Sequence, residues 1–406
     1  MVLLNFKNND ENAVLDDAVL SLERLTTWIE GNGWAGYDPY DVKESWPYEL
    51  IGKLKYPRLV FERLVLERHP VAIRKLFFVK KRIVPKAMGL FAHGFADLFQ
   101  LFDDRSYLDR SASCLNWLSN NMSSGHSGNC WGYPFDWASR IFIPHGTPSG
   151  VATTAVADGF YQASRIKSKY QNNWLEIAKN CVPFYVNDLN RYHDDQGNIC
   201  FSYTPIDNFQ IHNANLFIAK QLMRFGILSN NTEHINLAEN AVDYTLTHQQ
   251  SNGSWFYWGP PSNLTFSIDH YHTGFVLRTL HDIYLMTKEP KHLRAIKNGL
   301  DFYMENFFDR DGAPKLYVPK RFPIDIHSCA EAIICLSELR VTFPDCASLL
   351  LNTTKWTLKN MQSGSGYFYY LFKESYISKI PFIRWGQAWM LRALTAFVKS
   401  MTKEIH

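Results

Sequence analysis

Three carboxylates stand in segments that are rich in rings and lie far apart in the chain. Asp136 falls in the stretch 130–137, which also holds four large aromatic side chains, while Asp269 and Asp325 each follow an isoleucine and precede histidines. Burial beside rings raises a carboxyl pKa, which suits a general acid. With Asp136 as acid and Asp269 or Asp325 as the base that activates water, the pattern predicts glycoside hydrolysis. Capping of a turn or helix is the alternative explanation for each carboxylate.

Imidazole and phenol groups beside these carboxylates allow a second chemistry. Tyr271, His272 and His327 are the candidates, because histidine and tyrosine are common proton donors and acceptors near neutral pH. Removing the C5 proton of a uronic acid needs a base and an acid on opposite faces of the sugar. It also needs a group that neutralises the carboxylate, for which Arg384 or Asn213 could serve. The same segments therefore predict a uronate lyase or C5-epimerase as the alternative to hydrolysis.

The spacing of histidines, serines and cysteines does not indicate a metal site or a nucleophile triad. His270 and His272 form a His-x-His pair that suits zinc, but spacing places no third ligand. Ser328 lacks the Gly-x-Ser-x-Gly context, and Cys329 lacks a placed base. We therefore expect neither a metal nor a cofactor.

Aromatic and polar residues around these segments are typical of a sugar-binding cleft. Tyrosine and tryptophan rings stack on sugar faces, and carboxylates accept hydrogen bonds from hydroxyl groups. Arg384 would bind a carboxylate through two parallel hydrogen bonds. The alternatives are an Asp-Pro turn with Asp41 as N-cap and a buried helix face made by Trp385 and Trp389. The candidate substrate-binding residues are Asp38, Tyr40, Asp41, Trp131, Tyr133, Trp137, Arg140, Asn213, Trp255, Arg384, Trp385 and Gln387.

A glycine turn followed by aromatic residues recurs six times along the chain. The glycines are at positions 33, 128, 197, 253, 312 and 364, so the last five are separated by 69, 56, 59 and 52 residues. A repeat of this size indicates one supersecondary unit per turn. The first gap of 95 residues would hold two units if one turn has lost its signature.

The segments between the turns have helical periodicity. Apolar residues recur at helical spacing in 212–226, 235–248, 271–286 and 291–306, so each unit is two helices of roughly 15 residues with a short loop between them. Both ends of the chain carry the aromatic signature instead of the polar caps that a solenoid needs. We therefore predict an all-α (α/α)6-type toroid of helical hairpins, a single domain over 1–406, with short β-hairpins or extended aromatic loops at one rim.

The charge of the chain indicates a class of binding partner in only one segment. The chain has 406 residues, 46% of them hydrophobic, and a formal net charge of +3. Between 53 and 86 there are eleven Lys or Arg and two acids. This segment predicts peripheral contact with a membrane or an anionic polymer, and a solvated helix face is the alternative. We expect a saccharide substrate, which the basic residues would allow to be anionic, and no nucleic-acid partner.

The same composition predicts a cytoplasmic protein. The first ten residues lack the charged start and long apolar region of a secretory signal, and no run approaches the 18 apolar residues of a membrane span. The seven cysteines form no Cys-x-x-Cys pair. An odd and scattered set of this kind is typical of reduced thiols.

Five motifs resemble those of a bacterial protein family found in surface-polysaccharide and lipopolysaccharide gene clusters. The motifs are 36–41, 131–136, 272–275, 324–328 and 384–389. The resemblance spans nearly the whole chain and implies a six-hairpin glycosidase-like toroid that acts on a surface polysaccharide or its oligosaccharide precursor. More weakly, Asp269 to Thr273 is similar to an Asp-Tyr-His-Thr stretch in the helical domain of glucuronyl C5-epimerases, with His270 inserted here.

Two further hypotheses complete the set. The stretch 249–255 resembles the Gln-x-x-x-Gly-x-Trp repeat of terpene cyclases, but the chain has no Asp-x-Asp-Asp motif for that chemistry, so a turn that joins repeats explains it more simply. A toroid that binds glycans without catalysis, inside a polysaccharide assembly, is the other alternative. Hydrolysis, proton transfer and binding alone are thus the functions that the structure must help to separate.

Overall fold

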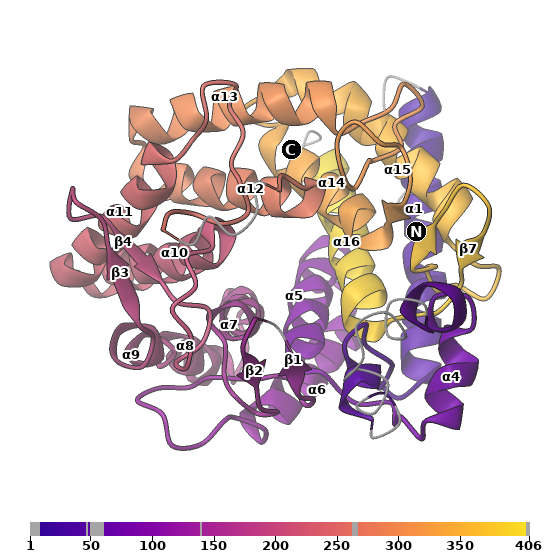
Figure 1. Cartoon of the computed structure of the whole chain (residues 1–406), viewed down its shortest axis with the longest axis horizontal. Coiled ribbons are helices and arrows are strands. Elements are labelled where there is room, and N and C mark those ends of the chain that lie inside the picture. The colour runs from indigo at the N-terminus through magenta and orange to yellow at the C-terminus, as the bar shows by residue number, and fades with distance from the viewer. Residues whose placement is uncertain (1–8, 46–47, 49–60, 139, 262–266, 403–406) are drawn as a thin grey trace.

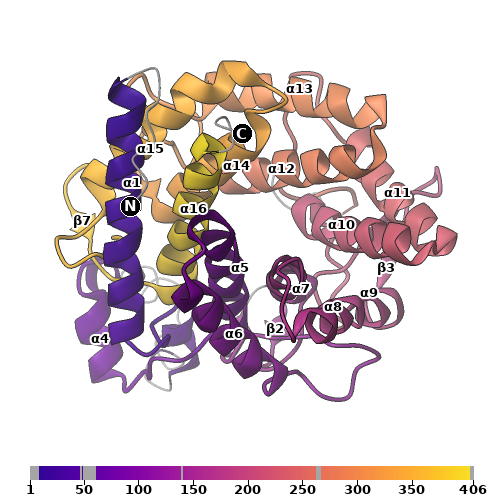
Figure 2. The same ribbon diagram turned by 180° about the vertical axis from the view of Figure 1, so that it is seen from behind.

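The computed structural model describes residues 9–45, 48, 61–138, 140–261 and 267–402. Within these residues, six helices form an inner ring and the other long helices surround them (Figures 1 and 2). The inner helices are α5 (Pro85–Phe102), α7 (Gly150–Ser164), α10 (His212–Ser229), α12 (His270–Thr287), α14 (Ile326–Leu339) and α16 (Trp389–Thr402). The outer helices are α1 (Asn9–Gly31), α6 (Arg105–Ser119), α8 (Gln171–Lys179), α9 (Val182–Asn187), α11 (Thr232–Thr247), α13 (Pro290–Asn306) and α15 (Ala347–Met361).

The inner ring is closed. Each inner helix contacts the next one along the chain, and α16 contacts both α14 and α5, so the last inner helix meets the first. The outer helix α1, which begins the described chain, packs against α16 and α15 near the opposite end of the sequence (Figure 2). The structure therefore confirms the toroid of helical hairpins and excludes a linear solenoid.

Sequence pattern explains why the helices form where they do. The inner helices are buried on nearly every side, as expected of helices enclosed by a second ring. Ser149, Asp269 and Asp325 are N-caps of α7, α12 and α14, because each side chain accepts a hydrogen bond from a backbone N–H in the first turn. The helices predicted over 212–226 and 271–286 are confirmed, with ends within three residues of the observed ones.

Short strands and turns connect the outer helices to the next inner helices. The strands are β1 (Trp137–Ala138), β2 (Phe142–Ile143), β3 (Arg191–His193), β4 (Ile199–Phe201), β5 (Ile324–Asp325), β6 (Leu371–Phe372) and β7 (Ile377–Ser378). They pair antiparallel as β1–β2, β3–β4 and β5–β6–β7. In the fourth turn Gly253 has φ +89°, and a Cβ there would collide with the backbone carbonyl of Asn298 on α13. The predicted hairpins and extended loops after the glycine turns are therefore present.

The segment between the first and second glycine turns does not contain two repeats. Its described part holds the single hairpin α5–α6, preceded by the short elements η1 (Asp41–Glu44), η2 (Phe61–Leu66) and α4 (Pro70–Leu76). The two-unit expectation for this gap is therefore wrong: the extra length is an insertion before α5, and six turns correspond to six hairpins in the described chain.

The basic segment 53–86 lies only partly within the described residues, since 49–60 fall outside them. Two of its cations point inward: Arg74 is buried against Asp41, and Lys86 is buried at the start of α5. Contact of this segment with a membrane stays a prediction. None of the described helices is long and apolar enough to cross a bilayer.

Candidate functional site

The inner helices begin at one mouth of the ring, and the aromatic loops meet there. Residues from the first turns of α5, α7, α10, α12 and α14 line a hollow of about 90 Å³, together with loop residues and η4 (Ile383–Ala388). We call this end the N-terminal mouth. Its lining includes Tyr40, Lys86, Tyr133, Trp137, Tyr203, Asn213, Tyr257, Tyr271, His272, His327, Arg384 and Trp385. The hollow is smaller than the ~300–1,000 Å³ typical of ligand pockets, so rim side chains must move to admit a sugar ring.

His272 is held in one orientation by its helix cap. One carboxylate oxygen of Asp269 accepts the backbone N–H of His272 at 3.0 Å, and the other lies 2.7 Å from the ring Nδ1. Because the carboxylate accepts, Nδ1 carries the hydrogen and Nε2 is the free nitrogen of the ring. The ring of Tyr257 lies 4.1 Å from the imidazole, centroid to centroid. Asp269 therefore both caps α12 and orients the ring of His272.

His327 is fixed in a similar way on the neighbouring inner helix. Its Nδ1 lies 3.1 Å from the backbone carbonyl of Trp385, which can only accept, so Nε2 is again the free nitrogen. Burial lowers the pKa of His327 well below its usual value, and the nearby Lys86 lowers it further. The imidazole is therefore neutral and able to accept a proton.

Tyr271 stands between the two imidazoles. Its ring centroid is 4.4 Å from that of His272 and 4.9 Å from that of His327. Burial raises the pKa of Tyr271 well above its ordinary value, and the carboxylates of Asp269 and Asp325 add to the shift. The phenol thus keeps its hydrogen at neutral pH and can donate it.

Asp325 lies behind this group. Its Oδ1 accepts the backbone N–H of His327 at 2.7 Å and the indole N–H of Trp385 at 2.9 Å. Burial raises the pKa of Asp325 to about 7, despite these hydrogen bonds. The carboxyl group therefore positions residues that line the hollow, and is not itself among the lining residues.

Several predicted binding residues are already engaged within the protein. Arg384 donates from Nε and Nη2 to the two oxygens of Asp38 at 2.6 and 2.7 Å, and both side chains are buried. Asp41 binds Arg74 at 2.8 Å. The predicted bidentate partner of Arg384 is therefore a carboxylate of the protein, although its guanidinium also lines the hollow and lies over the ring of Tyr133.

Three other predicted binding residues belong mainly to the packed interior. Trp131 and Trp255 each donate their indole N–H to a backbone carbonyl of the preceding outer helix, at 3.0 and 2.9 Å. Gln387 is fully buried and bonds both backbone groups of Phe368. Tyr40 and Trp137, by contrast, line the hollow, with their rings 6.0 Å apart.

Asp136 and Arg140 lie away from the hollow. Asp136 accepts the backbone N–H of His145 at 2.7 Å and contacts its ring, while Arg140 is exposed and covers the ring of Trp258. Among the described residues, Glu44, Asp136 and His145 form the one group spaced for a metal ion. Glu44 also pairs with Arg82 at 2.7 Å, and Asp136 and His145 pair with each other at 3.2 Å, so all three ligand groups already have partners.

The sequence did not identify Lys86, Tyr203 and Tyr257 as site residues. The two tyrosines occupy the aromatic positions that follow glycine turns, which is a signal that could have found them. Lys86 is 5% exposed, and its ammonium lies 5.3 Å from the ring centroid of Trp389. Asn213 was predicted and lines the hollow, with a buried amide oxygen that has no hydrogen-bond partner among the described residues.

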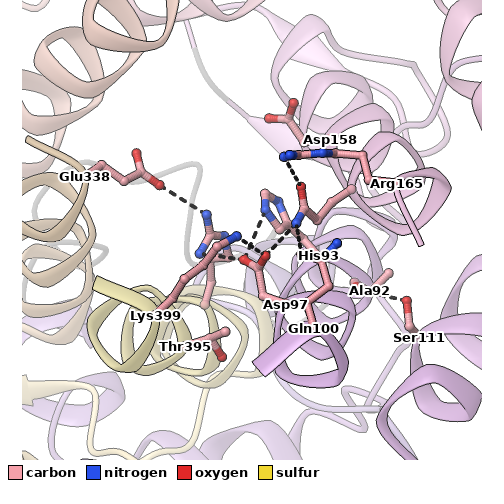
Figure 3. A network of polar contacts seen from close by, with 12 residues as sticks. Ala92, His93, Asp97, Gln100, Ser111, Asp158, Arg165, Glu338, Thr395 and Lys399 are labelled. Atoms are coloured by element: carbon pink, nitrogen blue, oxygen red, sulfur yellow. Dashed lines mark hydrogen bonds and ion pairs between the residues drawn. The ribbon is translucent and has the colours of Figure 1, made fainter. Parts of the chain in front are cut away.

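The opposite, C-terminal mouth contains a larger cavity of about 480 Å³, lined mainly by the later turns of the inner helices. The cavity also reaches Lys86 and Val151, which therefore border both hollows. Its charged side chains are largely paired with one another. Asp97 lies among Lys399, His93 and Arg392, and Figure 3 shows this carboxylate at the centre of the contacts. Because these charged side chains form ion pairs with one another, we place the candidate site at the narrower mouth, where free imidazole nitrogens, phenols and an unpartnered amide oxygen meet.

Comparison with known proteins supports the fold. No family model matches the sequence, and no curated protein matches it. The structure of cellobiose 2-epimerase from Bacillus thermoamylovorans matches 79% of this chain and 90% of that chain, with a TM-score of 0.63 and 9% identity. An unsaturated glucuronyl hydrolase specific for heparin matches 95% of this chain and 96% of that chain, with a TM-score of 0.62 and 13% identity.

A D-mannose isomerase is similar over 79% of this chain and 87% of that chain, with a TM-score of 0.58 and 12% identity. At these identities the comparisons show the fold alone. The chain therefore shares the helical-hairpin toroid of these structures, which is the fold that its sequence predicted.

Proposed function

We propose that this protein is a carbohydrate-active enzyme that transfers protons at a carbon next to a carbonyl or carboxyl group of a sugar. The observation that carries the proposal is the pair His272 and His327. Each ring is fixed through Nδ1, both line one aromatic hollow, and the phenol of Tyr271 stands between them. This is the arrangement that general acid–base catalysis requires, with groups positioned before the substrate binds.

The roles follow from the surroundings of each ring. His327 is neutral and acts as the base, so its Nε2 takes the proton from carbon. His272, which Asp269 holds through Nδ1, carries a second proton on Nε2 in the reactive form and returns it to carbon, and the Tyr271 hydroxyl hydrogen-bonds the oxygen that gains charge. Return to the other face of the same carbon gives epimerisation, and return to the neighbouring carbon gives isomerisation. Loss of a neighbouring oxygen substituent gives elimination.

The structural neighbours are consistent with this range. Cellobiose 2-epimerase and D-mannose isomerase are named for isomerising reactions of sugars, and they share the fold. Action on a bacterial surface polysaccharide or its precursor, in the cytoplasm, is the setting that the sequence motifs favour, and it belongs to the proposal.

Glycoside hydrolysis is the second candidate, and one observation favours it. Burial raises the pKa of Asp325 to about 7, so this carboxyl group is protonated in part of the molecules at neutral pH, as a general acid must be. The unsaturated glucuronyl hydrolase also shares the fold. However, Asp325 is not among the residues that line the hollow, and Asp136 lies outside it, so proton transfer by the histidines fits better.

The experiment is deuterium incorporation measured by NMR. The protein is incubated in D₂O with reducing sugars, disaccharides and uronic acids, and we expect loss of one carbon-bound proton signal. His272→Asn and His327→Gln should reduce the exchange rate by roughly 10²–10⁴-fold, whereas His193→Asn, on the exposed strand β3, should not.

The same samples are assayed for new reducing ends and for absorbance near 232 nm, which reports an unsaturated uronate. New reducing ends without deuterium exchange would replace the proposal by hydrolysis. Binding of glycans with no reaction in any assay would leave the protein as a glycan-binding component.

A further inference from the structure

Lys86 is a buried cation without a carboxylate of its own. Among the described residues no acid forms an ion pair with its ammonium, which lies over the ring of Trp389 at 5.3 Å from the centroid. The two carboxylates that influence it most, Asp38 and Glu331, bind Arg384 at 2.6 Å and Arg278 at 2.5 Å. The chain therefore places an amine against the hollow with no acid paired to it.

The charged form of Lys86 is unfavourable in the empty site. Burial lowers the pKa of Lys86 well below its usual value, and two neighbouring guanidinium groups lower it further. Transfer of an unpaired ammonium from water into a protein interior costs several kcal/mol, and the usual response is loss of the proton. The charged groups that face Lys86 are Arg384 from η4, Arg278 from α12, His327 and Glu331 from α14, and Asp38 from the loop before η1.

An anion bound in the hollow would favour the protonated form of Lys86. It would supply the missing partner of the ammonium, and it would also meet the first turns of several inner helices, whose backbone N–H groups favour negative charge. Because Lys86 already acts electrostatically on His327, the anion would lie beside the proposed base. Arg384 is less suited to this role, since Asp38 occupies two of its nitrogens.

We propose that Lys86 binds the carboxylate of an acidic sugar, and that the site takes up a proton when this anion binds. The inference rests on the proposed function for its placement in the same hollow, and it names the substrate class, a uronic acid or another carboxylated sugar. The carboxylate would be fixed next to the carbon that loses its proton, and the ammonium would stabilise the negative charge that develops there.

The test is isothermal titration calorimetry at pH 7 with glucuronate, galacturonate, glucose and glucose 6-phosphate. Each titration is run in HEPES and in Tris, whose ionisation enthalpies differ, so that the difference in heat reports protons taken up. We expect the uronates to bind with uptake of up to about one proton, and glucose to bind more weakly and without uptake.

Two substitutions and one control sharpen the result. Lys86→Met should weaken uronate binding about 10- to 100-fold, the usual range for loss of a charge-assisted hydrogen bond, and abolish proton uptake. Lys86→Arg should retain binding without uptake, because arginine is always charged. Lys297→Met, which removes an exposed ammonium on α13, should behave as wild type. Thermal unfolding of each variant confirms that it is folded.

The outcomes separate this inference from the proposed function. Equal affinity for uronates and glucose, or uronate binding that Lys86→Met leaves unchanged, overturns it even if neutral sugars exchange deuterium. Binding of glucose 6-phosphate but not of uronates overturns the carboxylate assignment, and so does the absence of any binding at millimolar concentration. Lys86-dependent uronate binding without deuterium exchange supports the inference and contradicts the proposed reaction.

Discussion

The two mouths of the helical ring differ in how their charged and polar side chains are paired. At the C-terminal mouth, carboxylates and cations from the inner helices bind one another around the circle. At the N-terminal mouth, the hollow contains imidazoles and phenols, and no carboxylate among the described residues forms an ion pair with Lys86. The same six hairpins thus present one end in which charged side chains form ion pairs with one another and one end in which imidazoles, phenols and an amine face a hollow.

Polar contacts in the middle and later turns of the ring link every inner helix to the next. The pairs in chain order are Asp97–Gln162 at 2.5 Å, Asp158–Lys220 at 2.8 Å, Lys220–Asp282 at 3.4 Å, Arg278–Glu331 at 2.5 Å, Glu338–Arg392 at 3.1 Å and Arg392–Asp97 at 3.6 Å. The last pair joins α16 to α5, where the ring closes. The comparison indicates that ion pairs join the inner helices toward one end, while the other end carries the groups to which we assign the proposed reaction.

The largest effect should come from the group that orients His272. Asp269→Asn keeps an N-cap of comparable strength but replaces the carboxylate that fixes and stabilises the imidazole. We expect the deuterium-exchange rate to fall by roughly 10²-fold or more, because the ring loses the carboxylate that fixes its tautomer and lies beside it as a charge. The midpoint of thermal unfolding should change little.

An exchange rate within a few-fold of wild type in Asp269→Asn would remove the functional meaning of this pair and leave it as a helix cap. Asn231→Asp, at the N-cap of the outer helix α11, is the matched control for exchanging the two cap residues. It should affect neither the exchange rate nor the fold.

At the C-terminal mouth the expected effect is on stability. Burial alone would raise the pKa of Asp97, but His93, Arg392 and Lys399 have the larger combined effect and lower it. Asp97→Asn leaves the cations of Arg392 and Lys399 without their shared counter-charge. It should reduce the free energy of unfolding by about 3–5 kcal/mol, as removal of one partner of a buried ion pair does, measured by urea denaturation.

The matched control for Asp97→Asn is an exposed pair. Asp301→Asn on α13 breaks the contact with Lys297, and both side chains are about half exposed, at 51% and 55%. No measurable loss is expected, since solvent screens such pairs. An equal loss in both variants would contradict the structural role given to the C-terminal mouth.

Asp325 gives the N-terminal mouth a pH-dependent stability. Its pKa is about 7 in the folded protein against 3.8 for the ordinary group, so between these values the folded state holds a proton that the unfolded chain has lost. Stability must therefore fall as pH rises from about 4 to 7. Roughly three units at 1.36 kcal/mol each give a contribution of up to about 4 kcal/mol.

Asp325→Asn should flatten this part of the stability profile, because the amide does not titrate and still caps α14. Urea denaturation of both proteins at several pH values measures the difference. Parallel profiles for the two proteins would show that Asp325 does not titrate in this range.

The sequence was sufficient for the fold because the fold depends on local patterns. Apolar residues at helical spacing located α12 and α13 nearly to the residue, and the repeated glycine turns predicted the number of hairpins. The insertion before α5 was not foreseen, because the length of a gap between turns does not show whether the gap holds a further repeat or an insertion.

The site was only partly predictable because its partners are far apart in the chain. The pairing of Asp38 with Arg384 spans 346 residues, and no local pattern indicates that one candidate would neutralise the other. Lys86 ends a basic run that looks like a solvated face, and only closure of the ring buries it. His272 and His327 were found, because each follows a capping aspartate at the start of an inner helix.

The smallest effect is expected at Asp136, which the sequence singled out as a general acid. Its neighbours Tyr133 and Phe135 pack inward with their rings stacked at 5.5 Å, while its carboxylate turns to the loop and holds His145. Asp136→Asn should therefore change deuterium exchange by less than about tenfold, against the ~10²–10⁴-fold expected for a group that transfers the proton. A loss in the larger range, with new reducing ends abolished as well, would move the chemistry from the histidines to the carboxylates. It would also extend the reactive region of the N-terminal mouth outward to its rim.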